Sequence, residues 1–166
     1  MKPFPLVSGS VIETNRYINV PLRMWERYPA RERREVWLRE ANGHESKWVI
    51  HTRVLPARRG HRVVLLIRKE WVVGLHNNST GEGVNYVRVD PPFLLRGVDL
   101  LVIAATAILL PWYLGAAGFV LLVPAGAGYL MAAIVVRVLH RWWLQFLVAA
   151  AMRELREVSN AGPRVV

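Results

Sequence analysis

The longest apolar pattern in the chain runs from Val98 to Val136 and contains two segments, Val98–Leu114 and Ala116–Val136. They hold 17 and 21 residues and are joined at Gly115. A helix rises about 1.5 Å per residue, so a hydrocarbon core of about 30 Å needs roughly 17 to 25 apolar residues. Both segments are long enough. The pattern therefore predicts a transmembrane helical hairpin.

Ahead of this run the pattern is mixed and predicts a small α+β soluble domain over residues 1–92. Residues 1–10 are expected to form an irregular arm. Alternating or β-branched runs bounded by turn residues predict four strands, over residues 11–20, 47–55, 62–73 and 84–89. The second and third runs are separated by Pro56–Gly60, which favours a hairpin between them. The boundary of the domain is expected at Asp90-Pro91-Pro92.

One firm helix is predicted in this domain, from Pro29 or Ala30 to Ala41. Pro29 suits a first helical turn, and Gly43 suits a helix end. Opposite charges four residues apart, Arg31 with Glu35 and Glu35 with Arg39, favour a helix as well.

After the hairpin, Trp142–Met152 is apolar on every side except at Gln145. Eleven residues are too few to span a bilayer. The segment is expected either to lie in the membrane interface or to extend the second helix against a partner. The chain thus divides into a basic cytoplasmic domain (1–92), a transmembrane hairpin (93–138) and an interfacial or amphipathic C-terminal helix with a tail (139–166).

Charge predicts the orientation. The chain carries 22 Lys and Arg against 12 Asp and Glu, and the connection Gly115–Gly118 between the apolar segments is uncharged. Because positive residues favour the cytoplasmic side, we expect two spans with both termini cytoplasmic, or on the interior side of a particle. The charges that define this topology are Arg96, Asp99, Arg137 and Arg141. The expected interface anchors are Trp112, Tyr113, Trp142 and Trp143.

Two features of the hairpin concern packing. Arg96 and Asp99 are three residues apart, so they are predicted to pair with each other rather than to form a proton relay or ion site. On the second helix, the small residues Ala125, Gly128 and Ala132 are predicted to let another helix approach closely.

Catalytic patterns are weak. The chain has no cysteine, and its five histidines show no spacing typical of a metal site. No serine stands in a nucleophile-elbow motif, and no pair of carboxylates suggests acid–base catalysis. The sequence therefore predicts neither an enzyme nor a cofactor.

The basic residues of the N-terminal domain are the main candidates for binding, namely Arg31, Arg33, Arg34, Arg58, Arg59 and Arg62. Anionic lipid headgroups are the partners that we favour for a basic surface beside a membrane. Other protein subunits come next, and nucleic acid is possible but not favoured.

The segment Asp90–Asp99, with the sequence DPPFLLRGVD, is followed at once by the predicted hairpin and a basic end. It resembles the start of the TraL family, short inner-membrane hairpin subunits of type IV secretion and conjugation systems. The resemblance covers about 50 of the 166 residues. Its matching positions are Asp90, Pro91, Leu94 and Asp99. Leu100 stands where the family usually has a second acidic residue, and the basic domain has no counterpart there.

The sequence as a whole predicts a nonenzymatic integral membrane subunit of a larger assembly. The hairpin would serve as anchor and packing surface, and the basic domain as a docking module. Two alternatives remain open: a structural protein of a membrane-containing virion or particle, whose domain contacts nucleic acid or capsid, and an oligomeric pore or effector.

Overall fold

The structure is a computed structural model that describes residues 4–20, 32–89 and 94–160. These residues divide into two compact units. The first, which we call the sheet domain, contains residues 4–20, 32–89 and 143–160. The second, the hairpin unit, contains residues 94–142. An antiparallel sheet followed by long helices confirms the predicted α+β layout.

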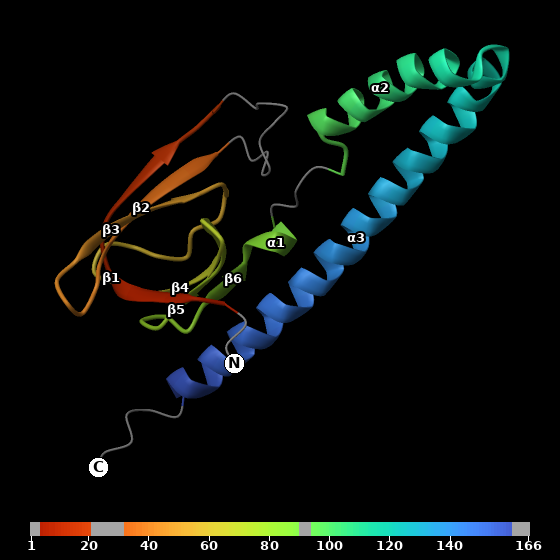
Figure 1. Cartoon of the computed structure of the whole chain (residues 1–166). Coiled ribbons are helices and arrows are strands. Elements are labelled where there is room, and N and C mark those ends of the chain that lie inside the picture. The colour runs from red at the N-terminus through yellow and green to blue at the C-terminus, as the bar shows by residue number, and fades with distance from the viewer. Residues whose placement is uncertain (1–3, 21–31, 90–93, 161–166) are drawn as a thin grey trace. The chain divides into compact units, whose positions relative to one another are not determined.

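The sheet domain is built on six antiparallel strands in the order β3-β2-β1-β4-β5-β6 (Figure 1). Their bounds are β1 Leu6–Tyr17, β2 Arg33–Arg39, β3 Glu45–Ile50, β4 Arg62–Arg68, β5 Trp71–Asn77 and β6 Gly83–Asn85. A single helical turn, α1 (Tyr86–Val89), follows β6.

β1 is the central strand and changes partner along its length. Its residues Leu6–Ser10 pair with β4, and Ser10–Tyr17 pair with β2. The register with β2 shifts between Val11 and Glu13, as at a β-bulge, which bends a strand and increases its twist. The prediction of an irregular arm over residues 1–10 is therefore wrong from Leu6 onward.

The main core lies on one face of the sheet. Its fully buried side chains come from strands β1 to β5, and they are Val11, Val36, Leu38, Ile50, Val63, Leu65 and Leu75. The opposite face of β4 and β5 is also buried, through Leu66 and Val73. β4 is thus covered on both faces, which explains why its sequence Val63–Ile67 is continuously apolar instead of alternating.

The second face is covered by the last part of α3 (Ala116–Asn160) (Figure 1). Leu144 and Val148 of this helix are buried against Leu66, Val73 and Val87.

Gln145 is the single polar residue of Trp142–Met152, and it makes two hydrogen bonds to the sheet domain. Its side-chain Nε2 donates to the backbone carbonyl of Val87 at 3.3 Å, and its backbone carbonyl accepts from Asn85 Nδ2 at 3.2 Å. Of the two arrangements predicted for Trp142–Met152, the structure has the extension of the second helix and not a separate interfacial helix. Residues 139–160 continue the second hairpin helix, and residues 143–160 belong to the sheet domain.

The predicted helix from residue 30 to 41 is wrong where the structure describes it, because Arg33–Arg39 forms β2. Val36 and Leu38 alternate with more exposed residues and enter the core, so burial in the sheet overrides the helical charge spacing. Residues 29–31 lie outside the described residues.

The predicted hairpin between residues 47–55 and 62–73 is also wrong. β3 pairs with β2, placing Trp48 opposite Val36, and does not pair with β4. The actual hairpin is β4–β5, inside the run expected to be one strand; its turn contains Lys69, at φ 52°. Nothing in that turn is a glycine, proline or asparagine, so the usual turn signal is missing. The strand predicted over 84–89 divides into β6 and α1.

The hairpin unit consists of α2 (Gly97–Leu114) and the first part of α3. Gly115 joins the helices at φ 56°, and its N–H donates to the Pro111 carbonyl at 2.9 Å. Gly118 lies so close to the carbonyl of Leu110 that a Cβ would clash with it. Both helices are long and apolar enough to cross a membrane, by length and composition.

Candidate functional site

The most distinctive chemistry of the described residues surrounds Asp99, which stands in the first turn of α2. Its side chain is only 2% exposed. Asp99 Oδ2 accepts a hydrogen bond from the backbone N–H of Arg96 at 2.6 Å. A carboxylate at this position satisfies an amide at the helix start, and it lies favourably in the helix dipole. This contact within the first turn of α2 is local in sequence and does not involve α3.

Two residues of α3 complete the site. Arg137 donates Nη1 to Asp99 Oδ2 at 2.5 Å and Nη2 to Asp99 Oδ1 at 2.6 Å, a bidentate ion pair. Tyr129 Oη donates to Asp99 Oδ1 at 2.8 Å. Tyr129 and Arg137 are eight residues apart, so they lie on the same side of α3 about two turns apart. We call Asp99, Tyr129 and Arg137 the charge cluster.

The charge cluster joins the two helices chemically. Arg137 Nη1 also donates to the carbonyl of Leu94, which fixes the segment just before α2. Both oxygens of Asp99 are occupied by donors, two of them from a guanidinium. An arginine keeps its proton in proteins, so this arrangement favours a structural lock over a path for protons.

The sequence predicts Arg96 as the ion-pair partner of Asp99, and the structure gives Arg137 instead. Arg96 contributes its backbone N–H to Asp99. Tyr129 was not among the expected functional residues. The signal for the pairing was available, because a charge inside an apolar helix usually pairs with a charge from a neighbouring helix.

The predicted basic residues of the sheet domain fall into two groups. Arg33 and Arg34 stand at the start of β2, beside the last residues of β1. They contact carboxylates: Arg33 with Glu35 at 3.4 Å, and Arg34 with Glu32 at 4.0 Å. Arg58, Arg59 and Arg62 are exposed, in the loop before β4 and at its start. Arg34 pairs with Arg16 of β1 and Arg62 with Ser10, so about 20 Å of strand separates the groups. Arg31 lies outside the described residues.

Acidic residues interleave with the first group. Glu35 is buried, and its carboxylate forms an ion pair with Lys47 at 3.0 Å in addition to the one with Arg33. The hydrogen bond from Lys47 is the main reason why the pKa of Glu35 lies below its usual value. Arg33 also covers the ring of Tyr17, at 4.9 Å from the centroid. This end of the sheet is consequently a mixed-charge surface.

The predicted interface anchors are exposed. Trp112 and Tyr113 stand at the end of α2, beside the Gly115 turn. Trp142 and Trp143 lie together on α3, where the guanidinium of Arg68 stacks 5.9 Å from the Trp143 ring.

The predicted packing residues of the second helix are exposed too, namely Ala125, Gly128 and Ala132. The less exposed positions of α3 follow a different stripe, which is Gly126, Leu130, Ala133 and Arg137. This second stripe has the helical spacing of a packed face and contains Arg137 of the charge cluster. The small-residue stripe is therefore left uncovered by α2.

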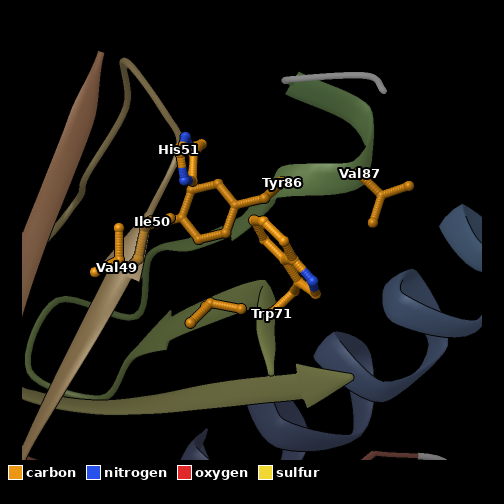
Figure 2. Close-up of a pocket in the computed structure, with 7 residues that line it drawn as sticks. Val49, Ile50, His51, Trp71, Tyr86 and Val87 are labelled. Atoms are coloured by element: carbon orange, nitrogen blue, oxygen red, sulfur yellow. The ribbon is translucent and has the colours of Figure 1, made fainter. Parts of the chain in front are cut away.

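A hollow in the sheet domain is too small to hold a ligand. Figure 2 shows His51, Trp71 and Tyr86 around it, with Val49, Ile50 and Val87. Its volume is about 10 Å³, which is about the minimum for one water molecule. The His51 and Trp71 rings pack at 5.7 Å between centroids. Across residues 4–20, 32–89 and 94–160, no three His, Asp or Glu side chains gather as a metal site would require.

No family model, curated protein or solved structure matches the chain. The resemblance to TraL-type subunits therefore stays a prediction.

Proposed function

We propose that this chain is a nonenzymatic integral membrane subunit of a larger membrane-bound assembly, with the hairpin as anchor and packing surface and the sheet domain as docking module. The observation that carries the proposal is the inverted polarity of the hairpin unit. Its large apolar side chains point outward, as with Ile108, Phe119 and Val123 at 69%, 66% and 78% exposed. Its carboxylate, Asp99, is inside.

This polarity suits a lipid environment. A long apolar helix in a soluble protein is normally buried, but few residues of α2 and none in the most apolar window of α3 are buried. Exposing this apolar surface to water would cost a large free energy, whereas lipid or partner helices would cover it. Charged side chains in membrane helices usually face inward and pair, as Asp99 and Arg137 do.

Both termini are assigned to the cytoplasmic or interior side. Support comes from the uncharged Gly115–Gly118 turn and from the arginines on the outer flanks, Arg96, Arg137 and Arg141. The exposed aromatic pair Trp112 and Tyr113 beside the turn suits the far interface, where amphipathic rings concentrate.

Assembly with other subunits is the second part of the proposal. Ala125, Gly128 and Ala132 form an exposed stripe on which a neighbouring helix can approach closely. In the sheet domain, Arg58, Arg59 and Arg62 make no ion pair with a carboxylate among the described residues, so they are available to an anionic partner surface. A secretion or conjugation machine of the TraL type is one such assembly.

Membrane extraction and mass measurement test this function. We expect the full chain to stay in the membrane fraction after alkaline carbonate washing. In mild detergent it is expected to run at a mass well above its 18.9 kDa, as an oligomer or with copurifying subunits. Release by carbonate would contradict the membrane part of the proposal. A clean monomer without partners would contradict the assembly part.

The free arginines of the sheet domain favour one alternative, a particle protein that contacts packaged nucleic acid. That function predicts binding of the full chain to DNA that weakens steeply with salt and is lost in Arg58→Gln/Arg59→Gln/Arg62→Gln. Absence of binding at low salt would exclude it.

A further inference from the structure

Two connections join the described parts of the sheet domain to the hairpin unit, and both leave the sheet domain at one end. α3 enters the domain at Trp143, and the other connection follows Val89, the last residue of α1. These points are neighbours, because Gln145 Nε2 donates to the Val87 carbonyl at 3.3 Å. We call the part of the sheet domain around α1 and the turn Trp143–Phe146 the junction end.

The turn between β4 and β5 lies at the junction end as well. The guanidinium of Arg68, the last residue of β4, stands 5.9 Å from the ring centroid of Trp143. β4 begins at Arg62, about 20 Å away along the strand. The exposed loop with Arg58 and Arg59 directly precedes Arg62, so the free arginines lie at the opposite end of β4.

Two large aromatic side chains are exposed at the junction end. Trp143 and Phe146 are 55% and 65% exposed. Trp143 follows Val136, the last residue of the second apolar segment, by seven residues, which is about 10 Å of helix. In the proposed topology this length brings the rings near the headgroup layer, where tryptophan is enriched.

The two segments beside these rings, residues 68–71 and 86–89, are basic. They contain Arg68, Lys69 and Arg88 against Glu70, so three positive charges and one negative charge leave a net charge of +2. Lys69 and Arg88 are exposed, and neither forms an ion pair among the described residues. Each basic residue close to an anionic membrane surface strengthens binding about fivefold. The junction end therefore has the composition of a surface that contacts anionic lipid.

We propose that the junction end rests on anionic headgroups of the membrane that holds the hairpin, with Trp143 and Phe146 in the interface and Lys69 and Arg88 on lipid phosphates. The inference rests on the proposed membrane function. It also separates two basic surfaces of the sheet domain. The junction end binds lipid, whereas the free arginines lie at the opposite end of β4 and stay available to another partner.

Spin labels on single cysteines test the inference in the full chain. Glu70→Cys reports on the junction end and Arg59→Cys on the opposite end of β4, and the chain has no cysteine of its own. Each labelled protein is placed in nanodiscs of phosphatidylcholine and phosphatidylglycerol that contain a nickel-chelating lipid. Nickel is expected to relax the label at position 70 at least about fivefold faster than the label at position 59, because about 20 Å of strand separates the two ends and dipolar relaxation falls steeply with distance.

Charge variants of the Glu70→Cys chain identify the contact. Lys69→Gln/Arg88→Gln is expected to lower the ratio of docked to undocked protein at least about fivefold, which appears as a loss of the nickel effect at position 70. Arg58→Gln/Arg62→Gln makes the same change of charge at the opposite end of β4 and is expected to leave the nickel effect unchanged.

A second pair of variants tests the aromatic contact. Phe146→Gln removes an exposed ring of the junction end and is expected to weaken the nickel effect at position 70. Val158→Gln makes a similar change at a position near the end of α3 that is 68% exposed, and it is expected to have no effect.

Nickel effects at position 70 that are no larger than at position 59, or that survive both Lys69→Gln/Arg88→Gln and Phe146→Gln, would overturn the inference. A loss caused by Arg58→Gln/Arg62→Gln would also overturn it and assign lipid binding to the opposite end of β4. Failure of the proposed function is separate, because it appears as release of the chain by carbonate. A retained chain with equal nickel effects at both positions refutes the lipid contact of the junction end alone.

Discussion

Each unit of this protein buries a carboxylate beside cationic side chains, and the two sites differ in what surrounds them. In the sheet domain, Glu35 is paired with Lys47 and Arg33, whose side chains are 42% and 36% exposed. In the hairpin unit, Asp99 is paired with Arg137, whose side chain is 17% exposed. If a cation is removed, water can hydrate the carboxylate of Glu35, because the cations beside it are partly exposed. Water hardly reaches Asp99, because Arg137 is mostly buried. The same ion-pair chemistry is therefore a minor surface contribution in one unit and a lock in the other.

The largest expected effect comes from breaking the charge cluster. Arg137→Met leaves the buried carboxylate of Asp99 without its charge partner and is expected to destabilise the hairpin unit by about 3 to 5 kcal/mol. The double variant Asp99→Leu/Arg137→Met removes both charges and is expected to recover most of that loss. Denaturant titration in detergent micelles measures both. Equal stability of Arg137→Met and the unmodified chain would show that the cluster is not a lock.

Removing apolar contact between α3 and the sheet tests whether the sheet domain includes the helix. Leu144→Ala truncates a buried side chain and is expected to cost about 2 to 5 kcal/mol. Leu139→Ala makes the same change at an exposed position of α3 and should change the stability of the sheet domain by less than about 0.5 kcal/mol. Tryptophan fluorescence during urea unfolding can compare them. Indistinguishable curves would mean that α3 is dispensable to the sheet.

His76 predicts a pH dependence specific to the sheet domain. It is fully buried in β5, and its Nε2 has no hydrogen-bond partner among the described residues. Burial, with a smaller contribution from Arg156, lowers the pKa of His76 below its usual 6.5. Below that pH the unfolded chain binds a proton that the folded chain does not, so stability should fall as pH drops.

The expected slope is at most about 1.4 kcal/mol per pH unit. Unfolding of the unmodified chain and of His76→Phe between about pH 7.5 and 5 checks it, since the variant should lose this slope. A variant with an unchanged slope would assign the acid sensitivity to other groups.

The smallest effect should come from the Lys47–Glu35 ion pair of the sheet domain, whose lysine is 42% exposed. Lys47→Met is expected to cost less than about 1 kcal/mol, because Glu35 keeps Arg33 and water reaches the site. The lowered pKa of Glu35 means that this contribution is present above its usual 4.5 and disappears as the pH falls through the lower folded-state pKa. Lys69→Met, at a lysine without an ion pair among the described residues, is the matched control. A loss as large as that of Arg137→Met would erase the contrast between the two units.

The sequence predicted the hairpin well and the sheet poorly, for one physical reason. The length and apolarity of Val98–Val136 are local properties, so a single stretch reveals them. The identity of β2 depends on neighbours: Glu35 has helical charge spacing, yet it pairs with Lys47 across the β2–β3 ladder, diagonally from the Trp37–Lys47 pair. The β4–β5 turn at Lys69 contains no glycine, proline or asparagine, so the apolar pattern predicted one strand where the structure has two.

Part of the site was beyond sequence for the same reason. Asp99 was predicted to form an ion pair, but its partner is Arg137 and not Arg96, because two helices bring together residues 38 positions apart. The apolar character of the segment after Trp142 is explained by contact with the sheet, because Leu144, Gln145 and Val148 pack against it. The sequence indicated that these apolar side chains must be buried against something. It did not show that the sheet of the same chain buries them.

The proposed topology, two membrane spans with both termini on the cytoplasmic side, is tested most directly by labelling single cysteines. The natural chain has no cysteine, so Ala116→Cys beside the turn and Arg59→Cys in the sheet domain each give one site without background. In sealed, right-side-out cells an impermeant maleimide should label Ala116→Cys at once and Arg59→Cys only after permeabilisation. Labelling of both positions from the same side would contradict the account.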